Sequence, residues 1–538
     1  MLIIKYVLLF LLLSLLCNGQ QFKERLDSAL KIAQDSVNSI YEKWDISHYP
    51  NFLKTVSMTH TSWEVMKLKF QHKILKAATG ANDVQFVMTF MGSSVTAGHD
   101  SPFNVSFSQT IGPRLSPAFN ALGVQAKSYG AALGNNPCLP YDICVHPFAG
   151  PDADVVHWEQ SFNCFGDSED KRPVFEWFVR QTLSLPNQAI AIFEDSSMPN
   201  WKEEDCNNVD TNPPSLDDED KQLLEHFKSG NSIKIATEMT KADMEKGWRA
   251  MIDLFKNYKT AGIQTWHHYH YDKYKCKGPY KKDWGCCSAS WHPSLKGHDL
   301  RSDHHVFYWL LILIDAIKDL QEKGERGETP EILLKVITKH IEAEHKYVPA
   351  TAMYESDYQD SQRCYTSFQP RRDDTLSLEK LMISSGDGKE GFKMEIIDKL
   401  QNNGDFIRRV AQYGYVDLKY MLYGNKDSGV LSLKIHVRQQ GTGFLCQPAG
   451  DWGRLPDGFQ NFWEIGTEVY LTENVGPDPQ NFVFAKDKSR LLEYINRKPK
   501  DTQTICVDFV QKLPAGDHVM TIVPTTDKKI MISYLIIP

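Results

Sequence analysis

The sequence predicts an α/β protein in which a three-layer α/β/α domain with a parallel sheet is followed by a β-sandwich. Two observations predict it: apolar runs alternate with helical segments early in the chain, and short alternating strands fill its last part. With 538 residues the chain is too long for one ordinary core. The predicted segments are a signal peptide at 1–19, N-terminal helices at 20–79, the α/β domain at 80–325, a helical and irregular connector at 326–390 and the β-sandwich at 391–538.

The first residues have the composition of a secretory signal. Lys5 precedes the apolar run Val7–Leu16, and Gly19 is followed by polar Gln20. The run is shorter than the ~20 residues of a spanning helix, so we expect cleavage, no stable membrane span and a secreted or lumenal protein. The motif Asn104-Val105-Ser106 predicts N-glycosylation at Asn104. The net charge of -8 gives no support to a nucleic-acid partner.

The cysteines agree with export. Cys17 lies in the predicted signal, and the others of the 11 cysteines include no CxxC pair. Disulfides are therefore favoured over zinc, and we expect no metal and no cofactor. Connectivity does not follow from sequence alone, but two local pairs are plausible: Cys138–Cys144 and Cys446–Cys506.

Each element of the α/β domain has its own signal. Apolar runs predict strands, and apolar residues at helical spacing predict helices. Pro113 and Pro117 predict a break or kink in one helix, and Asp303 is expected to cap another. The predicted strands are 84–90, 124–129, 154–158, 189–193 and 262–268, and the predicted helices are 22–78, 107–122, 174–185, 242–258 and 303–318.

After about residue 391 the apolar pattern has a period of two, as in strands with one buried face. The clearest example comprises Leu431, Leu433, Ile435 and Val437. Several such runs with turns between them predict a β-sandwich. Four aromatic residues of this region are interpreted as sandwich core, with a sugar-binding platform as the alternative: Trp452, Phe459, Phe462 and Trp463.

Ser94 follows the predicted strand 84–90 directly and stands between Gly92 and Gly98. A serine on such a turn lies at the carboxyl edge of the sheet, where open α/β sheets bind ligands. The glycines allow the backbone to approach closely. A serine hydroxyl becomes a nucleophile when a base lies within hydrogen-bond reach. The alternative is a glycine- and serine-rich turn without chemistry.

Four blocks of the sequence resemble those of the SGNH (GDSL-like) hydrolase family. Gly92-Ser93-Ser94 with Gly98 is similar to the family's Gly-Asp-Ser-x-x-x-Gly, although Ser93 replaces the Asp. The loop from Gly130 to Gly134 resembles the second block. In a degenerate third block, Asn163 stands at the oxyanion-hole position. His292-Pro293-Ser294-Leu295-Lys296-Gly297-His298 resembles the family's His-Pro-Ser-x-x-Gly-His.

The resemblance implies a flavodoxin-like SGNH fold and an ester hydrolase. It assigns Ser94 as nucleophile and His292 as the base that takes and returns its proton. The amides of Ser94 and Gly130 and the side chain of Asn163 would face the oxyanion. The expected substrate is a small-molecule or glycan ester, with carbohydrate and lipid acyl esters as the favoured classes.

One departure from the family concerns the group that orients the histidine. Ala289 stands where the family has an aspartate, so Asp283, Glu159 or a backbone carbonyl could take this role, or a Ser–His dyad could suffice. A catalytically inactive glycan-binding or cell-surface protein is the alternative function, and an acyltransferase using Ser94 is a third. The histidines within 267–270 are interpreted as lining of a cleft rather than as metal ligands.

Overall fold

The computed structural model describes residues 2–48, 50–54, 56–134, 136, 138–160, 172–195, 215–230, 258–264, 288–289, 292–293, 295–346, 362–384, 391–400, 404–448, 455–463, 467–473, 480–482, 504–509 and 511–538. The chain divides into two compact units, each of which combines segments that are distant in sequence. The helical unit comprises Met1–Met88, Val105–Tyr129 and Ile192–Pro349, and the β unit comprises Thr89–Asn104, Gly130–Ala191 and Ala350–Pro538.

The main sheet confirms the predicted α/β class. Its described strands are, in spatial order, β1 (Val56–Met58), β6 (Ala261–Gln264), β5 (Ile190–Asp195), β4 (Val155–Glu159), β2 (Gln85–Gly92) and β3 (Gln125–Gly130). Apart from β1, this is the flavodoxin-like order 2-1-3-4-5. β5 pairs with β6 in parallel, whereas β1 pairs with β6 antiparallel. β1 is an addition, because the sequence predicts only helix between residues 22 and 78.

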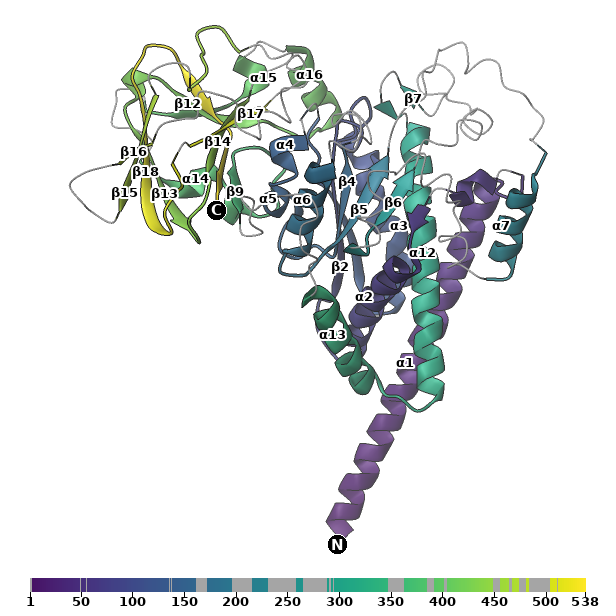
Figure 1. Cartoon of the computed structure of the whole chain (residues 1–538). Coiled ribbons are helices and arrows are strands. Elements are labelled where there is room, and N and C mark those ends of the chain that lie inside the picture. Colours follow the sequence, from purple (N-terminus) through teal and green to yellow (C-terminus); the bar gives the residue numbers. More distant parts are fainter. Residues whose placement is uncertain are drawn as a thin grey trace. The chain divides into compact units, whose positions relative to one another are not determined.

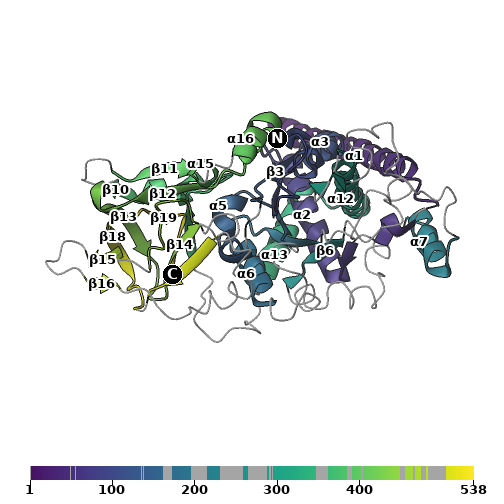
Figure 2. The same ribbon diagram turned by 90° about the horizontal axis from the view of Figure 1, so that it is seen from above.

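The helical unit is built around α12 (Leu295–Glu325), which is buried at every position from Leu300 to Ile314. α1, α2 and α3 pack against α12, and α13 packs against α2; α1 and α12 lie side by side in both views (Figures 1 and 2). The bounds of the other helices in this unit are α1 (Leu2–Lys43), α2 (His60–Ala78), α3 (Phe107–Ala121), α7 (Asp218–Lys228) and α13 (Pro330–Lys346).

Helix α3 runs through Pro113 and Pro117, so the break expected from these prolines does not occur. The carbonyl of Gln109, which loses its helical donor at Pro113, accepts a hydrogen bond from Ser128 Oγ at 3.3 Å instead. The predicted signal peptide lies within α1, and its cleavage stays a prediction. Among the described residues, we find no helix with the length and apolar character of a membrane span.

The β unit contains antiparallel sheets that confirm the predicted β region (Figure 2). The described strands of one sheet are, in order, β10 (Met382–Ser384), β13 (Leu431–Val437), β18 (Gly516–Pro524), β15 (Thr467–Glu473) and β16 (Gln480–Phe482). A second contains β17 (Thr504–Asp508), β14 (Phe444–Pro448), β20 (Tyr534–Ile537) and β9 (Arg363–Thr366), and a third contains β11 (Lys393–Ile396), β12 (Tyr420–Gly424) and β19 (Ile530–Ile532).

The first two of these sheets share one apolar core. The predicted inward residues of β13, from Leu431 to Val437, are buried in it together with Val507 of β17 and Leu535 of β20. Phe462 also belongs to this core, which supports the core interpretation of the aromatic residues in this region; Trp452 lies outside the described residues. Helices of the β unit are α4 (Cys138–Tyr141), α5 (Val145–Ala149), α6 (Arg172–Leu183), α14 (Leu378–Leu381), α15 (Ile397–Leu400) and α16 (Gly404–Tyr413).

Two disulfides test the predicted pairs. Cys446 and Cys506 face each other on β14 and β17 and are bonded, as predicted. The pair Cys138–Cys144 is wrong, because Cys144 is bonded to Cys364, 220 residues further along the chain. Tertiary packing of α5 against β9 brings these two cysteines together. Such a long-range pair cannot be predicted from the spacing of cysteines along the sequence.

Candidate active site

Ser94 lies on a hydrogen-bonded turn that begins where β2 ends. The amide of Ala97 donates to the Ser93 carbonyl at 3.0 Å, and the amide of His99 donates to the Ser94 carbonyl at 3.0 Å. Gly98 has a φ of +76°, a conformation that glycine adopts without steric cost. Ser94 is half-buried, whereas Ser93 is fully buried. The turn therefore keeps one serine inside and leaves the other accessible.

Glu159, the last residue of β4, supports this turn from inside the protein. Its carboxylate is fully buried and accepts hydrogen bonds from Ser93 Oγ at 2.6 Å, Ser93 N at 3.2 Å and Thr96 Oγ1 at 2.9 Å. Ser93 N also donates to the Glu159 carbonyl at 2.7 Å. A buried carboxylate needs such donors, so Glu159 and the turn stabilise each other. Its suggested contact with His292 stays a prediction.

Gly92 allows the turn to lie tightly against β4. A Cβ atom at Gly92 would lie 2.4 Å from Thr96 Oγ1 and 3.0 Å from the carbonyl oxygen of Glu159. Neither distance is compatible with van der Waals contact. The sequence identified Gly92 by its position after a strand, and the structure supplies the steric reason: a side chain there would displace Thr96 from Glu159.

The loop after β3 lies at the same edge. Ala131 N donates to the Phe90 carbonyl at 2.8 Å, and Leu133 N donates to the Gly92 carbonyl at 2.9 Å. The fully buried Tyr141 joins the two segments, because its hydroxyl donates to the Ala131 carbonyl at 2.5 Å and accepts from Gly92 N at 3.4 Å. Burial raises the pKa of Tyr141 well above its ordinary value, so the hydroxyl stays a donor.

β2 and β4 are neighbours in the sheet at the point where the strand order reverses. Ligands of open α/β sheets bind at this switch point, outside the carboxyl ends of the strands. The Ser94 turn, Glu159 and the loop that begins at Gly130 all follow those ends. The nucleophile and one oxyanion donor predicted from sequence therefore lie at the switch point of the sheet.

His292 belongs to the helical unit and is half-buried. It lies in β8 (His292–Pro293), which pairs antiparallel with β7 (Ser288–Ala289), so that Ala289 is the cross-strand partner of His292. The position of the missing aspartate is thus adjacent to the histidine backbone. Ser94 belongs to the β unit, and its proton transfer to His292 stays a prediction.

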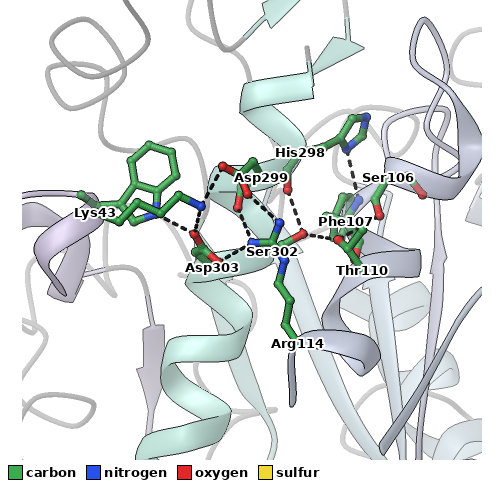
Figure 3. A network of polar contacts seen from close by, with 10 residues as sticks. Lys43, Ser106, Phe107, Thr110, Arg114, His298, Asp299, Ser302 and Asp303 are labelled. Atoms are coloured by element: carbon green, nitrogen blue, oxygen red, sulfur yellow. Dashed lines mark hydrogen bonds and ion pairs between the residues drawn. The ribbon is translucent and has the colours of Figure 1, made fainter. Parts of the chain in front are cut away.

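His298, the second histidine of the same sequence block, is fully buried in α12. Burial lowers its pKa to about 3, with the charge of Arg301 and the nearby His292 acting in the same direction. Its Nδ1 faces the amide of Phe107 at 3.4 Å, as Figure 3 shows. An Nδ1 that accepts this bond leaves the proton on Nε2. His298 is therefore a neutral structural residue beside the predicted base.

The expectation that Asp303 caps a helix is wrong. α12 begins at Leu295, and Asp303 lies two turns inside it, nearly fully buried. Its carboxylate forms ion pairs with Lys43 at 2.6 Å and with Arg114, and it accepts a hydrogen bond from Trp44 Nε1 at 2.8 Å. Figure 3 shows this network joining α12 to the end of α1 and to α3. Asp303 thus anchors three helices.

The remaining predicted residues have different outcomes. Asn104 is exposed, as a glycosylation site requires, and its modification stays a prediction. The oxyanion residue Asn163, Asp283 and the histidines of 267–270 lie outside the described residues. In the part of the chain that the structure describes, no group of three or more His, Cys, Asp or Glu side chains is arranged to hold a metal ion.

Comparison with known proteins gives a distant likeness. No family model matches the sequence, and no curated protein matches it either. Among solved structures, the chain is similar to a two-domain esterase (CEX) active on acetylated mannans, with 10% identity and a TM-score of 0.40 over 90% of this chain and 97% of that one. The same esterase co-crystallised with mannopentaose gives 9% identity and a TM-score of 0.37 over the same shares. At TM-scores this low, we infer nothing about the activity of this chain from the likeness.

Proposed function

We propose that this protein is an exported serine hydrolase of the SGNH type that cleaves acyl esters, with Ser94 as nucleophile and His292 as base. The observation that carries the proposal is the Ser94 turn at the switch point of the sheet. The turn exposes one serine, holds its neighbour on the buried carboxylate of Glu159 and has a second glycine loop beside it. This is the arrangement that a nucleophile and its oxyanion donors require.

The chemistry follows from these roles. Ser94 Oγ attacks the acyl carbon while His292 takes its proton, and the amides of Ser94 and Gly130 with the side chain of Asn163 stabilise the oxyanion. His292 then protonates the departing alcohol. A water molecule, deprotonated by the same histidine, hydrolyses the acyl-enzyme. We place the alcohol on a glycan, because a β region attached to an exported hydrolase suits carbohydrate recognition; this step is an analogy.

A fluorophosphonate probe tests the nucleophile. Labelling of the full chain, mapped by mass spectrometry of its peptides, is expected on Ser94 and is expected to vanish in Ser94→Ala. Ser229→Ala is the matched control, because it removes an exposed serine hydroxyl of the helical unit and retains the Ser94 turn. His292→Ala is expected to slow labelling by about 10²-fold or more. Label retained in Ser94→Ala, or absent from folded wild-type protein, refutes the proposal.

A catalytically inactive glycan-binding protein is the second candidate. Ala289 favours it, because the cross-strand partner of His292 lacks the carboxylate that orients the imidazole in the family. Acetate release from a panel of acetylated polysaccharides, measured beside binding of the same polysaccharides, separates the two functions. Binding without release or labelling supports the second candidate, whereas release that requires Ser94 supports the first.

A further inference from the structure

Asp417 of the C-terminal region is buried beside the Ser94 turn, within the β unit. It lies between α16 and β12, and its side chain is 2% exposed. Its Oδ2 atom lies 2.8 Å from His99 Nε2 and accepts a hydrogen bond from Gly134 N at 3.0 Å. In the described part of the chain, its other oxygen, Oδ1, is buried without a hydrogen-bond partner. A buried carboxylate oxygen without a hydrogen-bond partner is energetically unfavourable, so its presence requires an explanation.

The two partners of Asp417 belong to the two segments of the candidate site. His99 ends the nucleophile turn, because its amide donates to the carbonyl of Ser94. Gly134 ends the loop that begins at Gly130, and the preceding residue, Leu133, is hydrogen-bonded to the end of β2. One carboxylate oxygen therefore holds the nucleophile segment and the oxyanion segment at a fixed separation.

Neighbours of Asp417 hold the same two segments. The Tyr415 ring stacks on His99 with centroids 4.6 Å apart, and its hydroxyl accepts a hydrogen bond from Asp100 N. Lys419 Nζ donates to the carbonyl of Gly134. The segment 415–419 therefore contacts both sides of the site with three side chains, and Asp417 is hydrogen-bonded to both sides.

The packing at Gly134 leaves little freedom. A Cβ atom there would lie 2.4 Å from His99 Cε1 and 2.9 Å from Asp417 Oδ2. The backbone of the oxyanion segment is thus in direct contact with the His99 ring and the carboxylate. Because Asp417, the His99 ring and the Gly134 backbone are closely packed, a shift of Asp417 would also displace the two segments.

We propose that Asp417 is a positioning residue of the hydrolase site, so that the C-terminal β region completes that site and is not a separate accessory module. This inference rests on the proposed function. The rate of attack depends on holding the nucleophile and the oxyanion donors in register, and displacements of about 1 Å cost about 10²-fold in rate. Asp417 fixes the relative position of these groups, although it lies more than three hundred residues after Ser94 in the sequence.

The test compares Asp417→Ala and Asp417→Asn with Asp517→Asn in the full chain. Asn keeps an acceptor for His99 and Gly134, whereas Ala removes it. Asp517 is the matched control, because it forms an exposed pair with His436 at 2.7 Å in the same region. With an ester substrate, kcat is expected to fall about 10-fold in Asp417→Asn and about 10²-fold in Asp417→Ala, with KM unchanged and Asp517→Asn like wild type.

Hydrogen exchange in residues 93–100 and 130–134 provides a readout that is independent of activity. Both segments are expected to exchange faster in Asp417→Asn, and neither in Asp517→Asn. Wild-type kcat and exchange in a folded Asp417→Ala protein refute the inference, as does a rise in KM with kcat unchanged. If wild-type protein is neither labelled by the fluorophosphonate nor active, the proposed hydrolase fails and the positioning role fails with it, whatever the exchange shows.

Discussion

His298, one of the buried histidines of α12, makes the helical unit sensitive to acid, and the size of this effect can be calculated. The pKa of His298 is lowered to about 3 in the folded protein, chiefly by burial, against about 6.5 for an unfolded chain. The unfolded state therefore binds more protons between these two pH values. Stability from this group is fully present above pH 6.5 and is lost as the pH falls toward 3.

The magnitude follows from the two pKa values. Between pH 7 and pH 4.5 the unfolded chain gains a proton at this residue and the folded chain does not, which costs about 2.5 kcal/mol of unfolding free energy. His298→Asn is the informative variant, because the asparagine Oδ1 can take the place of Nδ1 as acceptor for the Phe107 amide while removing the titration. His298→Ala removes both the acceptor and the titration.

The assay is urea unfolding of the full chain followed by far-UV circular dichroism at a series of pH values. The carboxylates titrate in all three proteins, so the measured quantity is wild type minus variant. This difference is expected to shrink by about 2.5 kcal/mol from pH 7 to pH 4.5 for both variants, with His298→Asn the more stable of the two at pH 7. A difference that is constant with pH would refute the assignment of a neutral, buried His298.

Two further predictions concern packing and charge. Asp303→Asn is expected to cost about 1–3 kcal/mol, because it removes a nearly fully buried carboxylate that pairs with Lys43 and Arg114, each of which keeps Asp299 as a second partner. Asp35→Asn, at an exposed pair with Lys31, is expected to cost less than about 0.5 kcal/mol; thermal unfolding compares the two variants. Gly92→Ala is expected to slow fluorophosphonate labelling by about 10²-fold, because the added methyl group displaces the turn. Gly324→Ala is the control and is expected to leave the labelling rate unchanged, because a Cβ atom there meets nothing within 4 Å. Labelling rates measured on the folded variants test this prediction.

The strands of the main sheet could be predicted because burial on both faces leaves a continuous apolar run. β2, β4 and β5 have such runs, and their predicted positions agree with the structure within about two residues. β1 could not be predicted, because a three-residue edge strand shows no periodicity. The first eight residues of α12 were also missed, since His298, Ser302 and their neighbours are polar residues buried by specific hydrogen bonds, which a hydrophobic pattern does not reveal.

The candidate site could be predicted only where its residues are close in sequence. Gly92, Ser94 and Gly98 form a local motif, and the structure supplies the turn that this motif predicts. Asp417 carries no such signal, because its partners lie about three hundred residues away and an isolated aspartate has no distinctive neighbours. Glu159 was considered only as a partner of His292, and its described hydrogen bonds also hold the serine turn, a relation that depends on the adjacency of β2 and β4.

The bond between Cys144 and Cys364 has a consequence for the way the chain must be made. Cys144 leaves the ribosome long before its partner, 220 residues later, and enters an oxidising compartment if the protein is exported. Cys138, which also forms a disulfide in the folded protein, is synthesised just before Cys144, so a bond between these two cysteines is the expected premature product. Formation of the bond between Cys144 and Cys364 is therefore expected to need either delayed oxidation of Cys144 until Cys364 has been synthesised, or later disulfide exchange.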